Sequence, residues 1–480
     1  MKINEVLEMV KENSLWLQMS LSEWIKKDGV LEDLIEAKKL GLLVLPKMFF
    51  HLRKKFVEKI FQENQWGVII IRGPRRVGKT STIKYLIKSL IEEGYDKNSF
   101  IYLSLDNEEL LSILEKKKKL RNFLKEIINF FEKKKPLLIV LDEVTFYKGW
   151  ARAIKNLIDE GALKDRIGLI AMGSYSLDLS SAKSELAGRF GPAGEEVDGD
   201  VFFYPYRFVE IAENLLGKDF KDFFRKNIGY IGKRAGLLEY LCNYQTEAEI
   251  KKYRYIEILN TAIKKFYQDL HTLLEEVYIF SGGYPKSFFE AISTIRAKNK
   301  LFISDARYKQ DIFDLFINDA KKFGLDRNLL VKILLNISSP SMLVSKDFST
   351  LFFKIEEIKK DHRQKYISYL ESSGLFSLLP NISAPNQIIE KENKVIPSGK
   401  LLKLVINDPA VFFSLYLCSR GIEKDIVDEI KILLEKNLRN IKDLLYESIV
   451  LSHLKYFPLA RGFRNIGFIK EEKGKKRRSL

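Results

Sequence analysis

The sequence predicts an α/β protein built on a parallel, doubly wound sheet, and three patterns carry this prediction. Short apolar runs with the length of buried strands recur between about residues 64 and 212. Stretches with apolar residues at three- and four-residue spacing lie between them, as in amphipathic helices. Each run ends at an acid, a glycine or a proline within two residues. Strands that alternate with helices in this way form a parallel sheet covered on both faces.

Five strands are expected from these runs. They cover residues 66–71, 99–105, 137–141, 167–172 and 201–204. Helices are expected over residues 83–91, 120–131 and from Trp150 onward, and Gly94 stands where the first of these would end.

Residues 73–80 read GPRRVGKT, which matches the phosphate-binding pattern G-x-x-x-x-G-K-[ST]. The pattern follows an expected strand and precedes an expected helix, so its backbone N–H groups and the helix N-terminus would face an anion. Lys79 would neutralise the phosphates, and the hydroxyl of Thr80 would bind Mg²⁺. The residues expected to contact the nucleotide are Gly73, Pro74, Arg75, Arg76, Val77, Gly78, Lys79, Thr80 and Ser81. The sequence therefore predicts binding of a nucleoside triphosphate.

An acidic pair, Asp142 and Glu143, follows the third expected strand. The carboxyl end of that strand lies where open α/β sheets bind ligands, so Asp142 is expected to hold Mg²⁺ through water. Glu143 is placed to orient and deprotonate an attacking water. This favours hydrolysis over transfer of the phosphoryl group to another substrate. A solvated acidic pair at a strand end is the alternative, and the phosphate-binding pattern upstream argues against it.

Composition bounds the class of protein. The 480 residues include 81 basic and 64 acidic side chains, a net charge of +17, which suits a partner rich in phosphates such as DNA. A lysine- and glutamate-rich surface of a thermophilic protein would give the same excess. Cys242 and Cys418 are far apart, and the four histidines match no metal-ligand spacing. No apolar run approaches 18 residues and no signal-peptide core is present, so we expect a soluble cytoplasmic protein and no membrane partner.

Further motifs follow in the order GPRRVGKTS, LLIVLDEV, IAMGSYS, LAGRFGP, YPYRFVE and SGGYP. Over residues 64 to about 460 this order resembles a prokaryotic, chiefly archaeal, family of AAA-type P-loop ATPases. In that family a C-terminal extension carries a winged helix and a restriction-nuclease-like fold. The resemblance implies ATP as the nucleotide, with Mg²⁺, and a homo-oligomer in which an arginine finger acts on the neighbouring subunit.

The resemblance also implies roles for three single residues. Ser174 matches sensor 1, which positions the lytic water, although a strand-end turn would also accommodate a serine. Arg189 lies where an arginine finger reaches a neighbouring γ-phosphate, and a structural salt bridge is the alternative. Lys286 lies near the sensor 2 position of the lid, where most lids of this family have other residues.

The chain is expected to divide into five parts. These are an N-terminal helical segment at 1–63, an AAA-type core at 64–212, a helical lid at 213–322, a winged helix at 323–395, and a nuclease-like extension at 396–480. Glu447 matches the first metal carboxylate of such a nuclease, but the other acids and the E-x-K element are missing. One glutamate cannot hold two metals, so no nuclease is expected. The end, residues 473–478, is basic and would touch phosphates without sequence preference.

These expectations favour a magnesium-dependent ATPase that moves its lid and tail and acts on or with DNA. A nucleotide-dependent signalling switch with slow hydrolysis and no DNA role is the alternative. A scaffold that only holds nucleotide is a third class, and the intact Asp142–Glu143 pair argues against it.

Overall fold

The computed structural model describes residues 3–116, 119–131, 136–164, 166–174, 182–228, 254–298, 306–337, 360–380, 402–418, 441–443 and 445–450. The chain forms two compact units, Met1–Tyr204 and Pro205–Leu480. The five-part division expected from the sequence is finer than this and stays a prediction.

A five-stranded parallel sheet forms the centre of the first unit. Its strands are β1 (Gly67–Gly73), β2 (Phe100–Ser104), β3 (Leu137–Asp142), β4 (Ile167–Ser174) and β5 (Asp200–Phe202), in the order β2-β3-β4-β1-β5. All neighbouring pairs are parallel. The expected α/β fold class and its five strands are therefore confirmed.

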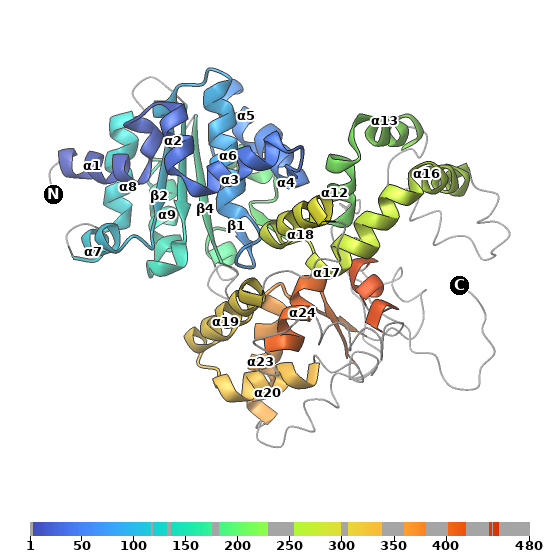
Figure 1. Ribbon diagram of the computed structural model, residues 1–480. Helices are drawn as coiled ribbons and strands as arrows, with labels where there is room; N and C mark the ends of the chain where they lie inside the picture. Colours follow the sequence, from blue (N-terminus) through green and yellow to red (C-terminus); the bar gives the residue numbers. More distant parts are fainter. Residues whose placement is uncertain are drawn as a thin grey trace. The chain divides into compact units, whose positions relative to one another are not determined.

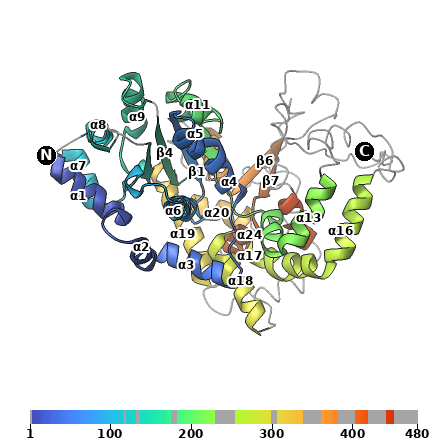
Figure 2. The same cartoon turned by 90° about the horizontal axis from the view of Figure 1, so that it is seen from above.

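Helices cover both faces of this sheet (Figure 1). In the first unit they are α1 (Ile3–Asn13), α2 (Leu21–Lys27), α3 (Gly29–Lys39), α4 (Lys47–Leu52), α5 (Glu58–Gln62), α6 (Lys79–Glu92), α7 (Glu108–Lys116), α8 (Leu120–Phe131), α9 (Trp150–Asp159) and α11 (Gly191–Glu195). Seen from above, α9 lies on one side of β4 and β1, and α6 lies on the other (Figure 2).

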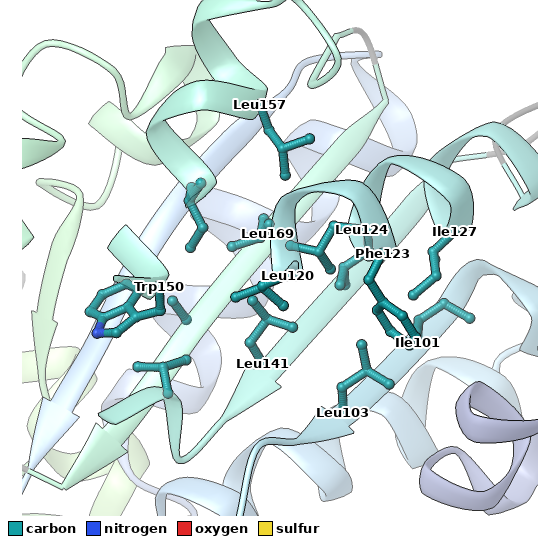
Figure 3. Close-up of a cluster of buried hydrophobic side chains, with 14 of the residues drawn as sticks. Ile101, Leu103, Leu120, Phe123, Leu124, Ile127, Leu141, Trp150, Leu157 and Leu169 are labelled. Atoms are coloured by element: carbon teal, nitrogen blue, oxygen red, sulfur yellow. The ribbon is translucent and has the colours of Figure 1, made fainter. Parts of the chain in front are cut away.

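One buried cluster joins α8, α9 and α1 to the sheet. Helix α8 contributes an apolar stripe at three- and four-residue spacing: Leu120, Phe123, Leu124, Ile127 and Ile128. The stripe packs on alternate residues of β2 and β3, such as Ile101 and Leu141, which share one face of the sheet because strand side chains alternate (Figure 3). Helix α1 joins the same cluster through Val6, Met9 and Val10, so the N-terminal helix is part of the core of this unit.

The second unit is mostly helical in its described parts. Its elements are α12 (Phe208–Leu215), α13 (Gly217–Ile228), α16 (Arg254–His271), α17 (Ile279–Ser281), α18 (Pro285–Lys298), α19 (Ala306–Lys322), α20 (Arg327–Ile337), α23 (Lys360–Ser372), β6 (Phe376–Pro380), β7 (Leu402–Ile406) and α24 (Pro409–Cys418). Strands β6 and β7 form an antiparallel pair. The helical lid expected at 213–322 and the winged helix expected at 323–395 stay predictions. Cys242 and the basic residues 473–478 lie outside the described residues.

Candidate functional site

The candidate site lies at the carboxyl ends of β1, β4 and β3, which are adjacent in the sheet. Gly73 at the end of β1 is in register with Ser174 at the end of β4. Asp142 ends β3, on the other side of β4. The sheet therefore brings the phosphate-binding pattern, the serine and the acidic pair to one edge, as expected for ligand sites of open parallel sheets.

The glycine-rich loop wraps around the side chain of Lys79. Arg76 and Gly78 both have positive φ, 64° and 89°, and the loop runs directly into α6 at Lys79. The Lys79 side chain is only 7% exposed, and its Nζ donates to the carbonyl oxygens of Gly73 at 2.8 Å and Pro74 at 2.9 Å. Val77 is buried and anchors the loop, whereas Arg76 is exposed. The ammonium is thus held at the N-terminus of α6, where the helix dipole also favours an anion.

Gly73 has a second reason to be glycine that the pattern does not reveal. A Cβ at this position would collide with the backbone carbonyl of Phe203 and come within 3.1 Å of its side chain. The N–H of Phe203 donates to the carbonyl of Arg72 at 2.6 Å, which holds this segment against the end of β1. Close packing of two backbones, as well as the curl of the loop, excludes a side chain there.

Thr80 and Asp142 form the oxygen-rich part of the site. The Thr80 hydroxyl donates to Oδ2 of Asp142 at 2.7 Å, and the backbone N–H of Glu143 donates to Oδ1 at 2.8 Å. Hydroxyl and carboxylate oxygens are the ligands that Mg²⁺ prefers, and Mg²⁺ needs few of them when phosphates and water complete its shell. The described residues contain no group of three or more His, Cys, Asp or Glu that could hold a metal ion. The hydroxyl of Thr80 and the carboxylate of Asp142 are donors of the kind that fit Mg²⁺ when a nucleotide supplies further oxygens.

Glu143 lies beside Asp142 in a strained backbone conformation. Its φ is 49°, in the left-handed region that residues other than glycine rarely adopt. The Ser174 hydroxyl lies 3.4 and 3.5 Å from the two carboxylate oxygens of Glu143. Burial and, to a lesser degree, the charge of Asp142 raise the pKa of Glu143, while Lys79 and Arg75 oppose this. A carboxylate with a raised pKa next to a hydroxyl is suited to accept a proton from water.

Tyr102, on β2, belongs to this site although the sequence did not single it out. Its hydroxyl donates to Oδ2 of Asp142 at 2.5 Å, and the side chain is buried. The available signal was a tyrosine in the alternating strand that precedes the one ending in the acid. Nothing in the sequence shows that β2 and β3 are neighbours, so the pairing could not be read from it.

Arg189 and Lys286 stand in ion pairs within the chain. The Arg189 Nε donates to Asp159 at 2.7 Å, and the arginine side chain is 35% exposed. Lys286, in the second unit, is 65% exposed and lies 4.0 Å from Glu290 on the same helix. Glu447 is exposed. The roles expected for these residues stay predictions.

The part of the chain that contains this candidate site matches a known family. The family described as an AAA domain matches residues 65–212, the stretch that contains the sheet and all the site residues above except Lys286 and Glu447. Residues 65–212 of the chain are thus similar to AAA domains. The chain is 28% identical over 133 residues to the uncharacterized protein MJ1637 of Methanocaldococcus jannaschii, a match that covers 27% of this chain and 26% of that protein.

Three solved structures resemble the chain at low identity. The Walker-type ATPase PABY2304 of Pyrococcus abyssi is 14% identical, with a TM-score of 0.40 over 77% of this chain and 94% of that one. The ORC1 protein of Aeropyrum pernix, solved in complex with DNA, is 13% identical, with a TM-score of 0.34 over 81% and 95%. CDC6P of Pyrobaculum aerophilum is 13% identical, with a TM-score of 0.27 over 83% and 94%.

None of the described helices combines the length and the apolar composition that crossing a membrane requires.

Proposed function

We propose that the chain is a magnesium-dependent ATP hydrolase. The observation that carries this proposal is the arrangement of three groups at the carboxyl ends of the strands. They are Lys79, the Thr80–Asp142 pair and the Glu143–Ser174 pair. These are a phosphate-binding cation, a pair of magnesium ligands and a base beside a polar hydroxyl. Such groups are what hydrolysis of a phosphoanhydride requires, because catalysis there consists of positioning and charge stabilisation.

Each residue of the site has a role in this proposal. The loop from Gly73 to Ser81 binds the phosphates, with its backbone N–H groups and with Lys79. Thr80 and Asp142 hold Mg²⁺, which when bound neutralises phosphate charge. Glu143 accepts a proton from the attacking water and Ser174 orients that water. Turnover of ATP drives movement of the helical lid and the C-terminal part, because contacts with a nucleotide bias domain closure.

DNA is the partner that we propose. Its support is the excess of 81 basic over 64 acidic residues, since phosphate contacts dominate the affinity of proteins for DNA. The decisive experiment is an ATPase assay with and without duplex DNA across protein concentration, with binding of labelled DNA measured as salt is varied. The slope of log affinity against log salt should be about −0.9 for each phosphate neutralised. Absence of binding at about 50 mM salt would contradict the DNA role and leave the ATPase role intact.

A slow nucleotide-dependent switch is the second candidate, and one observation favours it. Arg189 is paired with Asp159 of its own chain, so this arginine has a structural partner without any neighbouring subunit. A chain that hydrolyses ATP slowly at every protein concentration and ignores DNA would support the switch. Stimulation by DNA, or activity per subunit that rises with concentration, would support the motor.

A further inference from the structure

We propose that Tyr102 is a positioning residue for the magnesium-binding carboxylate, and that the N-terminal segment 13–28 holds Tyr102 in place. This inference rests on the proposed function, because it concerns how well the same site binds Mg²⁺ with ATP. It assigns a role in the nucleotide site to a part of the chain that precedes the AAA domain.

The carboxylate of Asp142 is held from three directions. Its Oδ2 accepts from the hydroxyl of Tyr102 at 2.5 Å and from that of Thr80 at 2.7 Å, while Oδ1 accepts from the N–H of Glu143. The donors come from β2, from α6 and from the turn after β3. The carboxylate cannot rotate without breaking one of these bonds. Partners of this kind behind a metal ligand fix its orientation.

Tyr102 is suited to be a permanent donor. Burial raises the pKa of its phenol well above the ordinary value, and the negative charge of Asp142 raises it further. A phenol is protonated at neutral pH even at its ordinary pKa of about 10, so the hydrogen bond to Asp142 does not depend on this shift. A buried phenylalanine would fill nearly the same space, so the hydroxyl rather than the ring is the part that serves the carboxylate.

Strand β2 lies at the edge of the sheet, and side chains of the N-terminal segment bind its free edge. The N–H of Leu105 donates to Asp142 O, toward β3, so residues 100, 102 and 104 turn their backbone groups outward. Ser14 donates its hydroxyl to the carbonyl of Tyr102 at 2.9 Å and accepts from its N–H at 2.8 Å. The Ser14 hydroxyl thus makes the two backbone hydrogen bonds that a neighbouring strand would otherwise make with Tyr102.

The flanking outward positions are bound in the same way. Asn13 Oδ1 accepts from the N–H of Ser104 at 3.1 Å, and the indole N–H of Trp16 donates to the carbonyl of Phe100 at 3.1 Å. Ser14 and Trp16 are both buried. Three consecutive outward positions of the edge strand are thus satisfied by one short segment, which leaves little freedom for β2 to shift.

A second contact links the segment to the side chain of Tyr102. Asp28 forms an ion pair with Lys84 of α6 at 2.7 Å, with both side chains largely buried. The Lys84 ammonium lies 5.5 Å from the centre of the Tyr102 ring, within the range of cation–π attraction. Backbone and ring of Tyr102 are therefore both restrained by residues 13–28.

The test is an equilibrium measurement of Mg²⁺ binding together with nucleotide, which does not depend on turnover. A fluorescent, non-hydrolysable ATP analogue is titrated in EDTA and then at increasing Mg²⁺ concentration. Mg²⁺ should enhance binding of the analogue. In Tyr102→Phe the Mg²⁺ concentration that gives half of this enhancement should rise roughly tenfold, as when other hydrogen-bond partners of metal ligands are removed. Affinity in EDTA should not change, because Lys79 and the loop are intact. The matched control is Tyr95→Phe, which removes a hydroxyl bonded to Gln62 beyond the far end of α6.

The role of the N-terminal segment is tested with Ser14→Ala, for which Ser20→Ala is the control. Ser20 caps α2 and is exposed, whereas Ser14 holds Tyr102. Ser14→Ala should shift the Mg²⁺ requirement in the same direction as Tyr102→Phe, and Ser20→Ala should not. Thermal melts identify a variant that fails to fold.

The outcomes separate the two proposals. If Tyr102→Phe and Tyr95→Phe share the wild-type Mg²⁺ requirement while the wild type binds the analogue, the positioning role is wrong and the proposed function stands. If Tyr102→Phe shifts the requirement and Ser14→Ala does not, the part assigned to the N-terminal segment is wrong. A wild type that binds no analogue in either condition contradicts the proposed function itself, and the inference falls with it.

Discussion

Each of the two units contains a glycine-rich turn, and the groups that surround the two turns differ. Residues 73–80 wrap the buried ammonium of Lys79 at the edge of the sheet, with a hydroxyl and two carboxylates beside it. Residues 282–285 lie in the second unit, from the end of α17 to the first residue of α18. The first was predicted as a phosphate-binding loop from its pattern. The second contains the SGGYP motif, and the family resemblance implied that Lys286 after it lies near the sensor 2 position.

The turn in the second unit is closed by protein. The N–H of Gly283 donates to Asp408 at 2.8 Å, and its carbonyl accepts from the N–H of Tyr206 at 2.7 Å. A Cβ on Gly282 or on Gly283 would collide with Asp408 or with the Tyr206 backbone, respectively. Asp408 is buried, and burial raises its pKa to about 7 although Gly283 and Ala410 donate to it. In both turns a glycine is thus required where protein backbone approaches closely, at Gly73 against Phe203 and at Gly283 against Tyr206. The groups around each turn are what distinguish the two.

Substitution of Lys79 should have the largest effect, because it tests whether the first turn faces a ligand. Lys79→Ala removes the cation that neutralises the phosphates, so binding of a non-hydrolysable ATP analogue should be abolished, with the fold intact. Calorimetric titration measures this, and circular dichroism checks the fold. Undiminished affinity would show that the loop is only a structural turn, like residues 282–285.

Substitution of Glu143, which lies beside the first turn, separates binding of ATP from its hydrolysis. Glu143→Gln keeps the shape of the side chain and removes the base, so turnover should fall on the order of a hundredfold or more. ATP should still bind with Mg²⁺. Wild-type turnover in this variant would mean that another residue activates the water.

The same residue predicts a pH dependence of turnover. A general base acts when deprotonated, so the rate should fall as the pH drops through the pKa of Glu143. Burial and the charge of Asp142 raise this pKa. The fall of the rate on the acidic side of the pH profile should therefore be centred above pH 4.5, the ordinary pKa of glutamate. This fall is measured from kcat at saturating ATP, and Glu143→Gln should lack it.

Substitution of Gly283 tests the second turn. Gly283→Ala forces a methyl group against backbone atoms of Tyr206, which cannot yield as a flexible side chain would. Overpacking of this kind should destabilise the protein by about 1–3 kcal/mol. Chemical denaturation measures the loss, with Gly29→Ala as the control, since a Cβ there meets nothing within 4 Å. Equal stability of the two variants would mean that the turn is not closed by packing.

Substitution of Arg189 should have the smallest effect. Its pair with Asp159 is partly exposed on both sides, so Arg189→Ala should cost less than about 1 kcal/mol. At each protein concentration, ATPase activity per subunit should be the same in Arg189→Ala as in the wild type. Loss of a concentration-dependent rise in activity would instead support the arginine finger, and mixing with Glu143→Gln would then partly restore activity.

Much of the first unit could be predicted because its signals are local. Apolar runs predicted all five strands within a few residues, since a strand buried on both faces must be apolar along its length. The phosphate-binding pattern and the Asp142–Glu143 pair were found in the same way, because chemistry at the end of a strand needs particular side chains at particular spacing.

Tertiary structure alone decided which of these local features meet. The sequence does not specify the strand order that places β4 between β1 and β3, or the contact of Tyr102 with Asp142 across 40 positions. It does not show that Ser14 holds the edge of β2, or that Gly73 is pressed against Phe203. Local patterns arise from the spacing of apolar residues and from the helix or strand propensity of residues within one element. These contacts instead depend on which elements pack together. The sequence by itself thus determined the chemistry available to the site, and the packing of β2 and the N-terminal segment decided how its carboxylate is held.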